Sequence, residues 1–88
     1  MLFMIRKQIM VHLNRGLQAR NATEFVFKAS SFNSDICLMK GGREVAAKSI
    51  MGVMSLAVRQ GEEIILSAKG KDNQKAIVTL ERFLSKAE

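Results

Sequence analysis

Residues 34–48 read SDICLMKGGREVAAK, and this stretch decides how the rest of the chain is interpreted. Two short segments flank Gly41 and Gly42, and a pair of glycines supplies the positive φ angles that a tight hairpin turn needs. The stretch therefore predicts two antiparallel strands, over 34–40 and 43–48, joined at the two glycines. The segments on either side of this hairpin indicate what packs with it.

The residues before the hairpin predict a strand and then a helix. In MIRKQIMVHL (4–13) the side chains alternate between two faces, and a period of two with β-branched residues is typical of a strand. NRG at 14–16 interrupts the pattern. From about residue 18 to residue 30 apolar residues recur with helical spacing, which predicts one buried helix face. That face consists of Ala22, Phe25, Val26 and Ala29.

The residues after the hairpin predict a helix, a strand and a second helix. Ser49 opens SIMGVMSLA (49–57), a short helix, and EEIILSAK (62–69) reads as a strand with Ile64 and Leu66 on one face. Asp72 is predicted to be the N-cap of the last helix. The apolar stripe of that helix consists of Ala76, Leu80, Phe83, Leu84 and Ala87.

The predicted order of elements is β-α-β-β-α-β-α. Helices that fall between strands and again at the end should cover one face of a single sheet. The expected fold is an α/β open-faced sandwich, with one antiparallel four-stranded sheet covered on one face by three helices. Because no repeat, linker or low-complexity tract interrupts the 88 residues, we expect a single domain over 1–88.

The composition excludes several classes of protein. The single cysteine rules out an internal disulfide and suits a reducing compartment, and no apolar run is long enough to span a bilayer. The first residues lack the features of a signal peptide. The net charge of +6 favours an acidic partner, but the basic residues do not cluster and no phenylalanine alternates with them. Direct nucleic-acid binding is therefore not favoured.

The residues that could do chemistry do not form a catalytic or metal-binding pattern. His12 is the only histidine and lies near the end of the first strand, without a carboxylate, serine or cysteine at catalytic spacing. Cys37 belongs to another strand and is expected to fill space as a small apolar group. No paired carboxylates, phosphate loop or nucleophile elbow is present. The sequence therefore predicts a protein that is not an enzyme and binds no metal.

The start of the first helix, GLQARNA at 16–22, carries polar and charged residues that packing of a hydrophobic core does not require. Helix N-termini attract anions, because their N–H groups are free and the helix dipole is positive there. Arg15 and Arg20 flank the opening, with Gln18 between them. From the residues alone, an ordinary helix start with two exposed arginines is the favoured reading.

The helix after Ser49 is apolar nearly all round, so it has more apolar surface than packing against one face of a sheet can bury. Val53, Leu56 and Ala57 form one stripe, and a second stripe should lie in the open as a docking surface. That second stripe consists of Ile50, Met51 and Met54. Ser49 itself is read first as an N-cap, and second as a phosphorylation site at the favourable end of the helix dipole.

GLQARNA and AKSIMGVMSLAVRQGEEI (47–64) together resemble the histidine phosphocarrier protein (HPr) family of the bacterial sugar phosphotransferase system. The resemblance covers nearly the whole chain, including the expected order of elements. In that family the first motif reads GLHARPA and its histidine carries phosphate, whereas Gln18 occupies that position here. Glutamine there, together with a retained regulatory serine, resembles the catabolite-repression branch of the family in bacilli.

The resemblance implies a cytoplasmic regulatory protein without cofactors. A glutamine amide forms no phosphoramidate because its nitrogen lone pair is delocalised, so Gln18 should carry no phosphate. A bifunctional HPr kinase/phosphorylase would phosphorylate Ser49, using ATP or pyrophosphate. The phosphorylated protein would act as co-repressor for a LacI-type catabolite control repressor, without contacting nucleic acid or membrane itself. The implied docking surface consists of Ser49, Gln18, Arg20, Ile50, Met51 and Met54.

Three features depart from the family, and two alternative functions stay open. About three extra residues precede the expected first strand. Asn21 replaces the family's proline, so the helix start should be less rigid. The net charge of +6 is more basic than is usual for the family. The alternative functions are a phosphocarrier that uses His12 and an unswitched binding module for a metabolic enzyme. A homodimer formed by exchange of the first strand is left open by the sequence.

Overall fold

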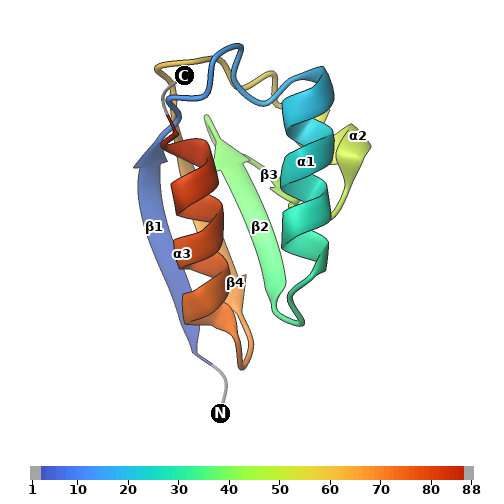
Figure 1. Ribbon diagram of the computed structural model, residues 1–88. Helices are drawn as coiled ribbons and strands as arrows, with labels where there is room; N and C mark the ends of the chain where they lie inside the picture. Colours follow the sequence, from blue (N-terminus) through green and yellow to red (C-terminus); the bar gives the residue numbers. More distant parts are fainter. Residues whose placement is uncertain (1–2, 87–88) are drawn as a thin grey trace.

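The computed structural model describes residues 3–86 and confirms the fold class predicted from the sequence. The strands form an antiparallel sheet in the order β1-β4-β2-β3. In Figure 1, α1 and α3 lie in front of this sheet, and α2 packs beside α1. The elements are β1 (Met4–Met10), α1 (Ala19–Ser30), β2 (Asp35–Lys40), β3 (Arg43–Ala46), α2 (Ile50–Ser55), β4 (Glu63–Lys69) and α3 (Asn73–Leu84).

The hairpin at the two glycines forms as predicted. Lys40 on β2 pairs with Arg43 on β3, and Gly41 and Gly42 between them have φ angles of 57° and 83°. Two consecutive left-handed residues are the signature of the hairpin turn that matches the twist of the strands. A Cβ at either glycine would meet nothing within 4 Å, so backbone conformation, and not packing, requires glycine here.

The hydrophobic core lies between the sheet and the helices. The predicted faces of both long helices are buried, and Ile77 joins the α3 face. The rings of Phe25 on α1 and Phe83 on α3 meet with centroids 6.4 Å apart. Ala87, which was expected in the α3 stripe, lies outside the described residues. The sheet contributes alternate residues of its strands, including Ile9, Ile36, Leu38, Ile64, Leu66 and Ala68.

The end of α2 corrects one prediction from the sequence. Ala57 was assigned to the buried stripe of this helix, but α2 ends at Ser55 and Ala57 is exposed. Its φ of 49° is left-handed, a conformation that commonly terminates helices. The next residue, Val58, is fully buried in its place.

The start of α3 corrects a second prediction. Asp72 occupies the N-cap position, but its side chain makes no cap hydrogen bond. Its carboxylate instead accepts hydrogen bonds from the backbone N–H groups of Asn33 and Ser34, at 2.8 and 3.0 Å, and from the Ser34 hydroxyl. The Asp72 carboxylate therefore joins the α1–β2 loop to the start of α3. The bonds from Ser34 and Asn33 lower the pKa of the Asp72 carboxyl.

Candidate docking surface on helices α1 and α2

The start of α1 presents Gln18, its N-cap residue, and Arg20, in its first turn, at the molecular surface. Gln18 is the N-cap residue, with an extended φ of −123°, and its side chain makes no cap hydrogen bond. Both Gln18 and Arg20 are exposed. They line an open pocket of about 470 Å³, together with Arg15 and neighbouring residues of the same loop. The two side chains are therefore available for contact with another molecule.

Asn21, which occupies the position of the family's proline, is hydrogen-bonded to the loop before this helix start. Its side-chain amide donates to the carbonyls of Asn14 and Gly16, at 3.0 and 2.8 Å. Its backbone N–H, which a proline would lack, donates to the Gln18 carbonyl at 3.0 Å. Hydrogen bonds to the preceding loop thus supply a restraint where the family's proline would supply a fixed φ.

The apolar residues of α2 divide as predicted from the two stripes, apart from Ala57. Val53 is fully buried, and Leu56 after the helix is 5% exposed. Ile50, Met51 and Met54 are 42%, 81% and 45% exposed. Soluble proteins rarely expose several large apolar side chains together unless a partner covers them. We call these three residues the α2 patch.

Ser49 stands at the beginning of this patch and caps α2 as predicted. Its Oγ accepts a hydrogen bond from the Gly52 N–H at 3.0 Å. The serine is half-buried, and no acidic residue lies in the first turn of the helix. An anion attached to this oxygen would lie where the helix end is partially positive.

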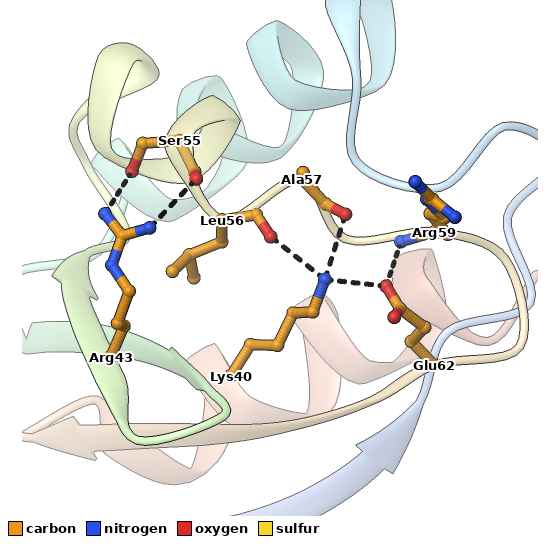
Figure 2. Close-up of polar contacts among 7 residues, drawn as sticks. All are labelled: Lys40, Arg43, Ser55, Leu56, Ala57, Arg59 and Glu62. Atoms are coloured by element: carbon orange, nitrogen blue, oxygen red, sulfur yellow. Dashed lines mark hydrogen bonds and ion pairs between the residues drawn. The ribbon is translucent and has the colours of Figure 1, made fainter.

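A polar network holds the other end of α2 against the sheet, as Figure 2 shows. The Lys40 ammonium donates to the carbonyls of Leu56 and Ala57 at 3.1 and 3.0 Å, and pairs with Glu62 at 2.9 Å. Hydrogen bonds from Lys40 and from the Arg59 backbone lower the pKa of the Glu62 carboxyl. Nothing in the local sequence around Lys40 predicts this role, because its acceptors are 16 or more residues away.

Arg43 adds a second attachment from the same hairpin. Its guanidinium donates to the carbonyl and the hydroxyl of Ser55, at 3.3 and 3.4 Å (Figure 2). The hairpin thus fixes the last turn of α2 through two basic side chains that flank the turn glycines. The orientation of the α2 patch follows from this attachment together with burial of Val53.

Helices α1 and α2 lie side by side and run in opposite directions. At one end, the Leu17 N–H before α1 donates to the Val58 carbonyl after α2 at 2.9 Å. At the other end, the Lys48 ammonium, beside Ser49, donates to the Phe32 carbonyl after α1 at 2.8 Å. The structure therefore brings the Gln18–Arg20 segment to the end of α2 where Met54 lies, with Ser49 at the opposite end.

The remaining reactive side chains lie away from this surface. His12 is exposed just after β1, and its backbone N–H donates to the Leu84 carbonyl at 2.8 Å. Cys37 is half-buried on the sheet face that no helix covers; burial raises the pKa of its thiol, and Glu44 adds to the rise. Within residues 3–86 no three potential metal ligands gather, and no helix is long and apolar enough to cross a membrane.

The fold and these motifs define a class of protein. The family profile described as "PTS HPr component phosphorylation site" matches residues 5–86. The chain therefore belongs to the HPr family.

Particular members of the family resemble it over most of their length. The HPr-like protein Crh of Bacillus subtilis is 48% identical over 81 residues, which cover 92% of this chain and 95% of Crh. The crystal structure of a phosphocarrier protein HPr from Bacillus anthracis superposes with a TM-score of 0.92 at 43% identity, covering 93% of this chain and 98% of that one. A crystal structure of Bacillus subtilis Crh, described as a dimer with a swapping domain, has a TM-score of 0.74 at 48% identity, covering 91% and 92%.

Proposed function

We propose that this protein is a non-catalytic regulator of carbon catabolite repression, acting in the cytoplasm as one HPr-like domain. The observation that carries the proposal is the α2 patch, which is exposed directly beside a half-buried serine at a helix start. The similarity to Crh, a protein described as belonging to catabolite repression, supports the same assignment.

Phosphorylation of Ser49 is the proposed switch. The HPr kinase/phosphorylase would transfer the γ-phosphoryl group of ATP to the Ser49 oxygen, releasing ADP while the hydroxyl proton goes to solvent. The new phosphate would replace the hydroxyl as the acceptor at the start of α2, where N–H groups and the helix dipole favour an anion. The phosphate beside the α2 patch would add a second contact for the partner, so tight binding would depend on phosphorylation of Ser49.

Gln18 and Arg20 supply contacts in this proposal and carry no phosphoryl group. The amide of Gln18 is not a nucleophile, but it can donate and accept hydrogen bonds where the family's histidine would lie. Arg20 presents a guanidinium that would pair with a carboxylate of the partner. These two residues flank the Met54 end of the α2 patch, opposite the end occupied by Ser49.

The proposed partner is a LacI-type catabolite control repressor, which would hold the DNA while this protein acts as co-repressor. Phosphoserine 49 would contact basic groups of the repressor, and the α2 patch would enter an apolar recess. The positive net charge of this chain would favour acidic groups around that recess.

The decisive experiment combines a kinase assay with a binding assay. The protein is incubated with the kinase and ATP, the phosphate is located by mass spectrometry, and the affinity for the repressor is measured before and after. We expect one phosphate, on Ser49, and tighter binding after its addition; the Ser49→Ala variant should show neither. Absence of the phosphate, or an unchanged affinity after modification, contradicts the proposal.

Two further assays separate the alternatives. Incubation with phosphoenolpyruvate and the first enzyme of the phosphotransferase system should leave the protein unlabelled, whereas an acid-labile phosphohistidine would favour a carrier that uses His12. An unswitched module for a metabolic enzyme would lose binding in Met51→Glu but not in Ser49→Ala.

A homodimer by exchange of β1 also belongs to the proposal. β1 is an edge strand, and it is joined to α1 by a turn in which Arg15 and Gly16 have φ angles of 72° and 62°. Bacillus subtilis Crh, described as a swapped dimer, supports this arrangement. Sedimentation at several concentrations should detect the dimer, and a concentration-independent monomer would contradict it.

A further inference from the structure

Phe27 lies in the second half of α1 and is exposed to solvent. It is 78% exposed, which is close to the 81% of Met51 in the α2 patch. The buried stripe of α1 consists of other residues, and the remaining exposed positions around Phe27 are polar or charged, as at Thr23 and Glu24. A single exposed apolar side chain is common in soluble proteins, so Phe27 gains significance only through its position relative to the docking surface.

Phe27 lies on the solvent-facing side of α1, opposite the buried stripe. The next residue, Lys28, lies on the α3 flank, with its ammonium 5.6 Å from the centroid of the Phe83 ring. One residue turns a helix by roughly 100°, so Phe27 cannot share that flank. It also does not face the core, where Val26 is buried. Phe27 and Arg20 are about two helical turns apart, so they lie on the same exposed stripe of α1.

Phe27 also lies toward the Ser49 end of the docking surface. It follows Arg20 by two helical turns, about 10 Å along the axis, toward the end of α1. That end meets the start of α2, where Lys48 donates to the Phe32 carbonyl. Arg20, Phe27 and the start of α2 therefore border one continuous surface, and the α2 patch lies beside it.

We propose that Phe27 is an aromatic anchor of this docking surface, inserting into an apolar recess of the same repressor that the proposed function assigns to Ser49 and the α2 patch. The inference rests on that proposed function. Aromatic side chains that fill a pocket commonly dominate an interface. Arg20 and Lys48 border the surface at its two ends, so the recess is expected to carry carboxylates at its rim. Glu24, about one turn before Phe27, lines a pocket with Lys28 and residues of α3.

The test compares substitutions at Phe27 with a matched control on α3. Phe27→Gln, Phe27→Tyr and Val78→Gln are each phosphorylated by the kinase and titrated against the repressor. Val78 is an exposed apolar residue, 46% accessible, on a helix outside the proposed surface. We expect Phe27→Gln to weaken binding by about tenfold or more, because it removes a buried aromatic contact. Phe27→Tyr should keep most of the affinity, and Val78→Gln all of it.

The outcomes distinguish this inference from the function on which it rests. If phosphorylated wild-type protein binds the repressor but Phe27→Gln binds as tightly as Val78→Gln, the inference on Phe27 is wrong and the proposed function stands. If phosphorylated wild-type protein does not bind, both are wrong. Thermal unfolding of each variant checks the fold, and a Phe27→Gln variant that is destabilised while Phe27→Tyr also loses binding would assign a structural role to the ring.

Discussion

Replacing Lys40 with methionine should release the last turn of α2 from the sheet. The Lys40 ammonium reaches two carbonyl oxygens that follow α2, those of Leu56 and Ala57, and its side chain is 26% exposed. Methionine keeps most of the aliphatic stem in place but cannot donate a hydrogen bond. The variant therefore removes the polar attachment while it largely preserves packing.

The magnitude follows from the two carbonyl contacts. A hydrogen bond contributes about 1 kcal/mol net to folding, so the loss of two predicts about 2 kcal/mol, without counting the ion pair with Glu62. For a chain of this size that corresponds to a fall in the melting temperature of roughly 10 °C. Lys7 provides the matched control, because it is also a strand lysine paired with a glutamate, Glu81, at 2.8 Å. It is half-exposed, and Lys7→Met should lose only about 0.5 kcal/mol.

Urea unfolding of the two variants, followed by circular dichroism, measures both free energies. Repressor binding by the phosphorylated Lys40→Met protein should also weaken, because Met54 lies just before the released segment. Equal destabilisation by Lys40→Met and Lys7→Met would refute the reasoning, since it would mean that the carbonyl contacts contribute nothing beyond a surface ion pair.

Three further predictions test single features of the fold. Gly16→Ala should destabilise the protein by roughly 3 kcal/mol in urea unfolding, because φ is +62° and a Cβ would lie 2.1 Å from the Val58 carbonyl oxygen. Gly41→Ala, with a φ of +57° but open space, should lose only about 1 kcal/mol, and equal losses would be inconsistent with this account. Asp72 has its pKa lowered below 3.8 in the folded state, so its stabilisation is present above pH 3.8 and is lost as pH falls through the lowered pKa. Asp72→Asn should therefore be less stable than wild type at neutral pH but not in strong acid; a difference that is constant with pH would contradict this. Asn21→Ala should lower the free energy of unfolding by about 1 kcal/mol through loss of its amide bonds, and an unchanged midpoint would show that these bonds do not restrain the helix start.

The sequence by itself determined the features that depend on residues close to one another along the chain. The two glycines at 41 and 42 predicted the hairpin, and helical or alternating spacing predicted each strand and helix within a few residues. The cap at Ser49 was predictable because its acceptor and donor lie three residues apart. The exposure of the α2 patch followed from a helix with two apolar stripes and room to bury only one. The position of Phe27 off the buried stripe of α1 was visible in the same way.

Only the tertiary structure decided which distant groups each polar side chain meets. Asp72 looked like a helix cap, yet its carboxylate binds a loop 38 residues earlier, because three converging donors are available there. The attachment of Lys40 to the end of α2 and the opposite directions of α1 and α2 likewise depend on how the hairpin and helices pack. Hydrogen bonds within a turn are fixed by local geometry, whereas contacts across the fold exist only once burial of the core has brought the segments together.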